Sequence, residues 1–495
     1  MSKKRFIKGA LWLTLTAAAM RAVGMGYRVY LSSKLGEEGM GLYQLILSVY
    51  MLGSAFAGAG ISIAVTRLVS GAVVQGSRRT VNKILRFSLG WSVALGTLVS
   101  IVFLGGAGGI AHHLLKAHES AAGLRILGLG LPFMSISAVY NGYFLAVGRV
   151  RYSCLAQVAE QAVRIGAVAL LIDRYVALGD AAACNIVFVG NTLSEAAAAL
   201  CLLIFYLKDC RRIPQGEESP DNVYARFLPI QLPIAAGKYI SSLLHTGENL
   251  LVPVSLEKFS GQRLGALGDF GALKGMALPL IMFPSSFLSS LAGLLIPELT
   301  AAATLRRQER IRTLTRTTLT VTFIFSVMMG GLFFRFGEPL GELIYHSESV
   351  GNILKWLSPV IPFMYLDCIT DGLLKGIGEQ MASLRYSTTD SLVRIALVFF
   401  WVPRGGLSAF LGIMAISNCS VALLGLRRLI RVTDCTPPIK QGVILPLAGV
   451  LTAHFLSVWV SNLLLAATVY MAVFLLFLIG GGVLNKQNLQ PFFKP

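Results

Sequence analysis

Apolar runs of about twenty residues recur along the whole chain, separated by short charged or Gly- and Pro-rich breaks. A helix needs about 20 residues to cross roughly 30 Å of hydrocarbon at 1.5 Å per residue. The pattern therefore predicts an all-α membrane protein with about fourteen transmembrane helices. The runs lie near residues 8–31, 40–66, 84–110, 124–147, 152–172, 181–207, 227–252, 266–297, 315–336, 353–374, 383–403, 406–426, 442–462 and 464–484.

The two halves of the chain share a sequence pattern. Leu131–Met134 (LPFM) recurs as Ile361–Met364 (IPFM), and Val163–Ile165 recurs unchanged as Val393–Ile395, each 230 positions later (131 to 361, 163 to 393). Such a constant register predicts duplicated six-helix lobes. Because each unit has an even number of helices, the lobes are expected to be parallel repeats, an arrangement that transporters use around a central cavity.

The polar breaks suggest where these parts begin and end. The longest polar stretch follows the sixth apolar run, and the last two runs lie outside the repeat. We therefore expect an N-terminal six-helix lobe over 1–207, a cytoplasmic linker over 208–226, a C-terminal six-helix lobe over 227–431, and two additional helices with the C-terminal tail over 432–495.

Composition places most of the chain in lipid. Hydrophobic residues make up 55% of the 495 positions and charged residues 14%, whereas soluble domains carry roughly 25% charged residues. The net charge of +19 indicates Lys and Arg retained in cytoplasmic loops, and no nucleic-acid partner is expected. The basic clusters Arg78–Arg86, Arg306–Arg316 and Arg427–Arg431 fall on one side of the membrane if both termini are cytoplasmic. We expect a multi-pass protein of the cell membrane in that orientation.

Enzymatic chemistry finds no support in the sequence. There is no P-loop, no metalloprotease helix and no nucleophile elbow. The seven cysteines are scattered without a C-x-x-C pair, so they predict neither a disulfide framework nor a zinc site. We therefore expect no enzymatic activity, no cofactor and no metal.

Arg21 and Arg28 are the sharpest candidates for binding. They are seven residues apart in the first predicted helix, so they project from one face. Ionisable residues inside membrane helices mark functional sites unless they snorkel to an interface. Snorkelling would explain Arg28 at the outer end, but it fits Arg21 poorly, since Arg21 lies roughly 20 Å along the helix. A functional role is favoured over a structural one.

Two charged pairs have helical i, i+4 spacing, Glu160 with Arg164 and Asp390 with Arg394. Each pair can neutralise itself within its own helix. A salt bridge at the lobe interface and a contact with substrate therefore remain equally open, because pairing lowers the cost of burial without a ligand.

Four further charges lie in the seventh and eighth predicted helices: Lys238, Glu248, Asp269 and Lys274. Cations lining a cavity would complement a phosphate, and Lys274 is the preferred one. Glu248 and Asp269 could bind a coupling cation or proton, or be interface charges. The sequence leaves the coupling ion open.

Several segments resemble the stage V sporulation protein B and polysaccharide flippase branch of the multidrug/oligosaccharidyl-lipid/polysaccharide exporter superfamily. They are Phe6–Leu11, Arg21–Gly24 followed by Arg28, Gly36–Tyr43 (GEEGMGLY), Ala64–Ser70 and Gln157–Arg164. The resemblance implies two six-helix lobes around a V-shaped basic cavity, and transport of an undecaprenyl-pyrophosphate-linked sugar by alternating access.

The resemblance also suggests substrate-binding residues. Lipid II flippases contact their substrate through basic residues of the first and eighth helices, which corresponds here to Arg21, Arg28 and Lys274. Arg67, within the matching segment Ala64–Ser70, is added as a fourth. The family would place an arginine where this chain has Lys274.

These observations together predict a flippase that moves a lipid-linked cell-wall or polysaccharide precursor across the cytoplasmic membrane. Its expected partners are a lipid-linked oligosaccharide or disaccharide-peptide substrate, membrane lipid and cell-wall synthesis proteins, and we expect a monomer. The first alternative is an ion-coupled multidrug antiporter on the same fold. The cations Arg21 and Arg28 argue against it. The second is a membrane glycosyltransferase or polymer ligase, but it would need a large outer loop or an acidic catalytic cluster, and neither is visible.

Overall fold

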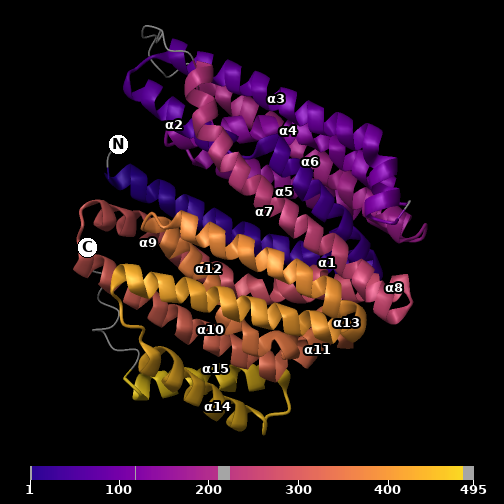
Figure 1. The fold of residues 1–495 in the computed structure, drawn as a ribbon, viewed down its shortest axis with the longest axis vertical. Coiled ribbons are helices and arrows are strands. Elements are labelled where there is room, and N and C mark those ends of the chain that lie inside the picture. Colours follow the sequence, from indigo (N-terminus) through magenta and orange to yellow (C-terminus); the bar gives the residue numbers. More distant parts are fainter. Residues whose placement is uncertain (1–2, 118, 210–222, 483–495) are drawn as a thin grey trace. The chain divides into compact units, whose positions relative to one another are not determined.

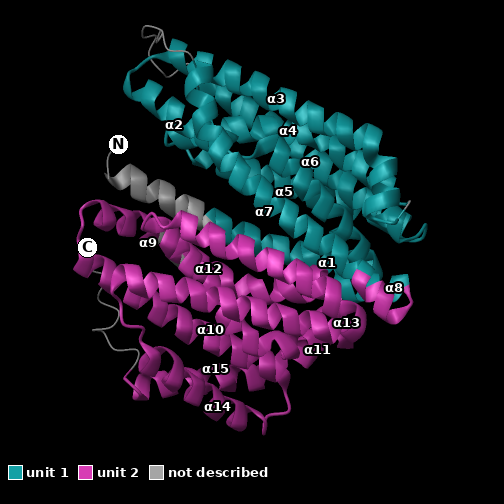
Figure 2. Cartoon of the chain, in the orientation of Figure 1, with its two compact units in different colours: residues 1–254, 263–271 teal, residues 255–262, 272–495 magenta. Residues whose placement is uncertain are grey.

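The computed structural model describes residues 3–117, 119–209 and 223–482, and this part of the chain contains helices and connecting turns but no strand. The chain forms two compact units (Figure 2). Unit 1 comprises residues 1–254 and 263–271, and unit 2 comprises residues 255–262 and 272–495. The boundary between the compact units therefore falls within helix α7 (Val223–Ser260). The lobe boundaries expected from the sequence repeat stay a prediction.

Unit 1 is built mainly from the helices of the first half of the chain (Figure 1). They are α1 (Lys3–Gly58), α2 (Ile61–Val74), α3 (Arg78–Gly109), η1 (Ile110–Leu114), α4 (Ser120–Ala146), α5 (Arg151–Val176), α6 (Asp180–Asp209), α7 (Val223–Ser260) and α8 (Arg263–Phe270). α4 packs against α2, α3 and α6, and α5 packs against α6 and α1. The core between α2, α3 and α4 includes the fully buried Val65, Val81 and Tyr143.

Unit 2 holds the remaining helices. They are η3 (Gly271–Ala277), α9 (Leu278–Thr304), α10 (Gln308–Tyr345), α11 (Glu348–Leu357), η4 (Ser358–Val360), α12 (Ile361–Gly376), α13 (Gln380–Thr433), η5 (Lys440–Ile444), α14 (Leu445–Ser457) and α15 (Leu463–Gly480). α12 packs against α9, α10 and α13. α14 and α15 pair with each other and pack on α10, where Met328 and Phe336 meet Tyr470 and Phe474.

Two helices are too long to cross a membrane once. α1 has 56 residues and α13 has 54, so each would be about 80 Å long if straight, against roughly 30 Å of hydrocarbon. Each is broken at a glycine with positive φ, Gly36 (φ 66°) and Gly406 (φ 58°), a conformation that glycine adopts without the steric cost of a Cβ. Each helix therefore consists of two arms, which correspond to two separate apolar runs.

The described helices agree with a protein that crosses the membrane many times. Ten helical stretches are long and apolar enough to span a membrane among the residues that the structure describes. Two of these stretches contain the breaks at Gly36 and Gly406, and α7 and α14 coincide with two further apolar runs. The prediction of about fourteen helices is consistent with this arrangement.

The ends of the helices follow the sequence repeat. α3 begins at Arg78 and α10 at Gln308, and α4 ends at Ala146 and α12 at Gly376, each pair 230 positions apart (78 to 308, 146 to 376). Helix ends are set by local sequence and packing, so their recurrence at one offset supports duplication. The fold is thus an all-α bundle with a duplicated pattern of helices and two additional C-terminal helices.

α7 is attached to unit 1 by a row of polar contacts. Thr246 Oγ1 donates to the Ser48 carbonyl over 3.0 Å, and Asn249 Nδ2 donates to Ser48 Oγ over 3.1 Å. Closer to its start, the Gln231 side chain accepts a hydrogen bond from Trp91 Nε1 at 2.9 Å. These contacts explain why most of α7 belongs to unit 1.

Candidate functional site

The first arm of α1 carries both predicted arginines. Arg21 is exposed and also interacts with another group of the chain, whereas Arg28 is half-buried. Seven residues correspond to about 10 Å along a helix, on nearly the same face. Arg28 interacts electrostatically with the phenol of Tyr43 on the second arm. Among the described residues no carboxylate forms an ion pair with Arg28.

Arg164 is the centre of a polar cluster between α5 and α6, which we call the α5–α6 cluster (Glu160, Gln161, Arg164, Ser194 and Glu195). Its guanidinium donates to Glu160 at 2.5 Å, to Gln161 at 3.2 Å and to Ser194 Oγ at 3.3 Å. The ion pair predicted from i, i+4 spacing is present and partly exposed. Ser194 is a partner that only the packing of α5 on α6 supplies.

Glu195 belongs to this cluster and was not among the predicted site residues. It is half-buried and interacts electrostatically with Glu160 and Arg164. An acid inside the apolar run 181–207 is unusual enough to mark it. The sequence analysis weighed other charges in the predicted helices and did not single out Glu195.

The matching pair in unit 2 is more deeply buried. Arg394 and Asp390 form an ion pair at 2.7 Å, with side chains 16% and 11% exposed. Ser417, on the second arm of α13, donates to both oxygens of Asp390 at 2.7 and 2.8 Å. A cavity of about 310 Å³ opens above the pair. Its walls come from both arms of α13: Tyr386, Thr389, Asp390, Val393, Arg394, Leu397, Ile416, Ser417, Ser420, Val421 and Leu424.

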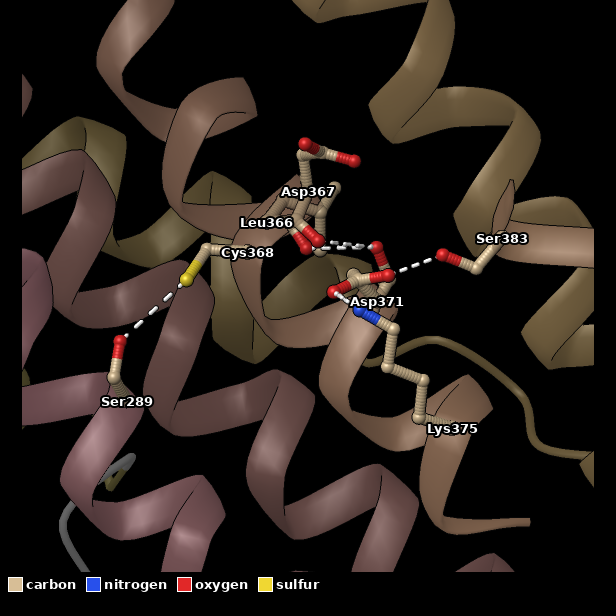
Figure 3. A network of polar contacts seen from close by, with 8 residues as sticks. Ser289, Leu366, Asp367, Cys368, Asp371, Lys375 and Ser383 are labelled. Atoms are coloured by element: carbon tan, nitrogen blue, oxygen red, sulfur yellow. Dashed lines mark hydrogen bonds and ion pairs between the residues drawn. The ribbon is translucent and has the colours of Figure 1, made fainter. Parts of the chain in front are cut away.

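A second charged network in unit 2 lies on α12. Asp371 pairs with Lys375 at 2.6 Å and accepts a hydrogen bond from Ser383 of α13. Figure 3 shows the Asp367 carboxylate one turn earlier, directed away from the Asp371–Lys375 pair. Asp367 is half-buried, and among the described residues no side chain hydrogen-bonds to its carboxylate. The sequence analysis did not single out these acids, although they interrupt an apolar run.

We expect Asp367→Asn to stabilise the protein. Asparagine removes a half-buried charge that has no ion pair, at nearly constant volume, so less charge has to be desolvated. The midpoint of thermal unfolding of the purified protein should rise by about 2 °C or more. Asp371→Asn is the matched control, because it breaks the ion pair with Lys375 and should not raise the midpoint. An unchanged or lower midpoint for Asp367→Asn would show that the carboxylate has a stabilising partner.

Lys274 lies in η3, a π-helical segment of unit 2. Insertions of this kind in helices are frequent at functional sites. The side chain is half-buried, and its Nζ lies 5.8 Å from the ring centroid of Phe410, which is fully buried. A cation over an aromatic face is attracted electrostatically by the ring quadrupole.

The remaining predicted residues are distributed over three helices. Arg67 on α2 and Lys238 on α7 are exposed. Glu248 on α7 is 1% exposed and interacts with another group of the chain, which fits a structural charge. Asp269 on α8 is half-buried, and it interacts electrostatically with Glu37 of α1.

Comparison with known proteins places this geometry in a family. Residues 6–302 match the family described as polysaccharide biosynthesis protein. Stage V sporulation protein B of Bacillus subtilis (strain 168) is 24% identical over 421 residues, covering 84% of this chain and 81% of that protein. Lipid II flippase MurJ of the same organism is 24% identical over 431 residues, covering 80% of this chain and 77% of that protein.

The fold has a solved counterpart. The inward-facing conformation of a multidrug resistance MATE family transporter of the MOP superfamily superimposes with a TM-score of 0.68 at 17% identity, covering 84% of this chain and 94% of that one. At this identity the likeness concerns the fold. With the family match over more than half of the sequence, the chain belongs to the polysaccharide biosynthesis protein family, and its many long apolar helices are those of a multi-pass membrane protein.

Proposed function

We propose that the protein is a non-enzymatic flippase that moves an undecaprenyl-pyrophosphate-linked cell-wall or polysaccharide precursor across the cytoplasmic membrane by alternating access. One relative is named as a lipid II flippase, and the same class of substrate is proposed here. The protein is expected to act as a monomer, with cell-wall synthesis proteins as partners.

The observation that carries the proposal is Arg28. It is half-buried in a membrane helix, and no carboxylate among the described residues pairs with it. A guanidinium in that setting can form bidentate hydrogen bonds to phosphate oxygens. Arg21, on nearly the same face about 10 Å away, provides a second such fork.

A flippase must solve a problem of desolvation. The head group of the precursor is charged and hydrated, and transferring it unaided through hydrocarbon is prohibitively costly. Fixed cations along its path replace the lost water, while the polyprenyl chain stays in lipid. The basic residues Arg21, Arg28 and Lys274 are proposed for this role.

Native mass spectrometry of lipids that co-purify with the protein tests the substrate class. The wild type should retain a polyprenyl-pyrophosphate-linked sugar, and the Arg21→Ala, Arg28→Ala double variant should lose it while keeping ordinary phospholipids. Retention of the same precursor by both proteins would argue against these arginines as its ligands.

An ion-coupled multidrug antiporter is the second candidate. Glu195 and Asp367 support it, because acids in membrane helices suit cationic drugs or coupling ions. Cells expressing the protein would then extrude organic cations, and Glu195→Gln would abolish extrusion. The flippase proposal predicts no extrusion above the level of an empty vector.

The proposed orientation places both termini in the cytoplasm, and it predicts how single cysteines label in a cysteine-free background. Gln308→Cys, at the start of α10, should be shielded from an impermeant thiol reagent in intact cells, because basic segments are retained inside. Glu348→Cys, at the start of α11 next to Ser347, should react. Both positions are exposed, so reversed labelling would invert the topology. The segment Gly216–Asp221, also expected inside, lies outside the described residues.

A further inference from the structure

Two basic side chains of unit 2 lie on α10 and α14, helices that carry none of the proposed substrate-binding residues. Arg335 is half-buried on α10 and His454 is half-buried on α14, and these two helices pack against each other. The two groups interact electrostatically, and the His454 ring centroid lies 5.9 Å from that of Phe334, the neighbour of Arg335. Both side chains therefore reach the same region, which we call the Arg335–His454 site.

Each side chain contains a nitrogen that the described part of the chain leaves without a hydrogen-bond partner. These buried atoms are Arg335 Nε and His454 Nδ1. Among the described residues Arg335 also has no ion pair, and its Cζ lies 5.3 Å from the ring centroid of Phe336. The acid nearest to it in sequence, Glu338, instead pairs with Lys355 at 2.9 Å. Because buried unsatisfied donors cost free energy, a ligand that accepts hydrogen bonds is favoured here.

The site borders a surface that these helices present to lipid. Leu451 and Phe455 on α14 and Phe334 on α10 are large apolar residues with exposed side chains, and they are close neighbours of His454 and Arg335 along their helices. Both helices belong to apolar runs that are expected to cross the membrane. Exposed apolar side chains in such helices contact hydrocarbon, so a lipid chain can lie beside the two basic groups.

The depth of the site in the membrane matches that of lipid phosphates. Arg335 is the last residue but one of the apolar run 315–336, and His454 is three positions before the end of α14 at Ser457. The turn that follows contains Trp459, which is 80% exposed, and tryptophan is enriched at membrane–water interfaces. In the proposed orientation this interface is the outer one.

We propose that Arg335 and His454 together bind the phosphate of an anionic phospholipid from the outer leaflet, whose chains lie against the exposed apolar residues of α10 and α14. A guanidinium binds phosphate oxygens through a bidentate fork. An imidazole with its proton on Nδ1 donates a further hydrogen bond even when it is neutral. The lipid thus connects α14, which lies outside the sequence repeat, to α10. It is a resident of the protein and not its cargo.

The test measures retention of phosphatidylglycerol by the full-length protein in nanodiscs, by native mass spectrometry, without any lipid-linked precursor. Arg335→Gln and His454→Leu should each weaken retention about ten-fold, because each removes hydrogen bonds to a charged group. Arg404→Gln is the matched control, since it removes an exposed cation on α13. An equal loss in Arg404→Gln would reduce the effect to surface charge. Wild-type retention by His454→Leu would reduce it to snorkelling of Arg335 alone. Either result would overturn the proposal.

Thermal unfolding shows whether the variants fold and whether the lipid acts at this site. In detergent without lipid, Arg335→Gln should unfold at or above the wild-type midpoint, because no ion pair is broken. Added phosphatidylglycerol should raise the midpoint of the wild type, since a ligand of the folded state stabilises it, and raise that of Arg335→Gln and His454→Leu less. A lower midpoint of Arg335→Gln without lipid would reveal a protein partner, and equal stabilisation of all three proteins would place the lipid elsewhere; both contradict the proposal.

Competition identifies the source of the phosphate. Phosphatidylglycerol should remain bound in millimolar inorganic phosphate, because its chains contribute to binding, and it should be retained in preference to phosphatidylcholine, whose head group carries a cation. Displacement by inorganic phosphate would assign the site to a soluble anion, and equal retention of both lipids would remove the preference for an anionic one; each overturns the proposal. Since no flipping is measured, failure here leaves the proposed function untouched, and failure of flipping leaves this site untouched.

Discussion

Replacing Arg21 and Arg28 together by alanine is expected to lower flipping per inserted molecule by about 100-fold or more. Hydrogen bonds to charged groups contribute about 1.5–3 kcal/mol each, and 1.4 kcal/mol corresponds to a factor of ten. Arg28 has no carboxylate partner among the described residues, so its truncation leaves no stranded acid there. The protein should therefore insert at a normal level and fail in transport.

The measurement is the fraction of labelled lipid-linked precursor that becomes accessible at the opposite face of proteoliposomes, normalised to inserted protein. Arg21→Lys and Arg28→Lys should be partly active, because the charge remains but the bidentate fork is lost. Arg86→Ala, an exposed cation on α3, serves as the control and should flip normally. Reduced membrane abundance with unchanged activity per molecule would instead identify the arginines as structural.

Separating the ion pair on α13 is expected to have the largest effect on stability. Asp390→Leu leaves the Arg394 guanidinium in a site where its side chain is 16% exposed. Removing one partner of a buried pair costs about 3–5 kcal/mol, whereas replacing both by apolar residues is often neutral. The thermal midpoint of the purified protein should drop sharply for Asp390→Leu and recover in Asp390→Leu, Arg394→Leu.

Two more exposed ion pairs of the same protein show how this loss of stability should depend on burial. The pair Glu160 and Arg164 is more exposed, at 27% and 22%, and should show a smaller loss for Glu160→Leu. Asp371 and Lys375 are more exposed still, at 37% and 55%, so their interaction should be worth less than about 1 kcal/mol. If Asp390→Leu and the double variant were equally unstable, the damage would come from repacking and not from the loss of the ion pair.

Much of the fold could be predicted because a membrane helix can be recognised in a sequence by the length and apolarity of its residue run. The runs do not reveal backbone geometry, however. The polar stretch near Gly36 was expected to separate two helices, and the two arms of α1 do separate there, although the break is confined to the single residue Gly36. In the same way, the run 40–66 conceals the end of α1 at Gly58 and the start of α2 at Ile61. Hydropathy reports the preference for lipid, and these breaks depend on local dihedral angles.

Some features of the candidate site could likewise be predicted from the sequence, and others could not. Pairs at i, i+4 could be predicted, because the helix itself fixes that distance, and both ion pairs are present. Their serine partners, Ser194 and Ser417, lie on the neighbouring helix or arm and depend on packing that no local pattern encodes. Glu195 and Asp367 could have been found by asking which acids interrupt an apolar run.

The chain passes back and forth between the two compact units, and this determines what happens when the protein is expressed as two separate fragments. Residues up to Val254 belong to unit 1, Ser255–Gln262 to unit 2, and Arg263–Gly271 again to unit 1. Two polypeptides separated within the polar linker would therefore leave most of α7, together with α8, on the fragment that otherwise forms unit 2. Each co-expressed fragment would expose surface that only the other can cover. The halves of this duplicated protein are thus suited to fragment complementation, and neither is a domain that could be expressed alone.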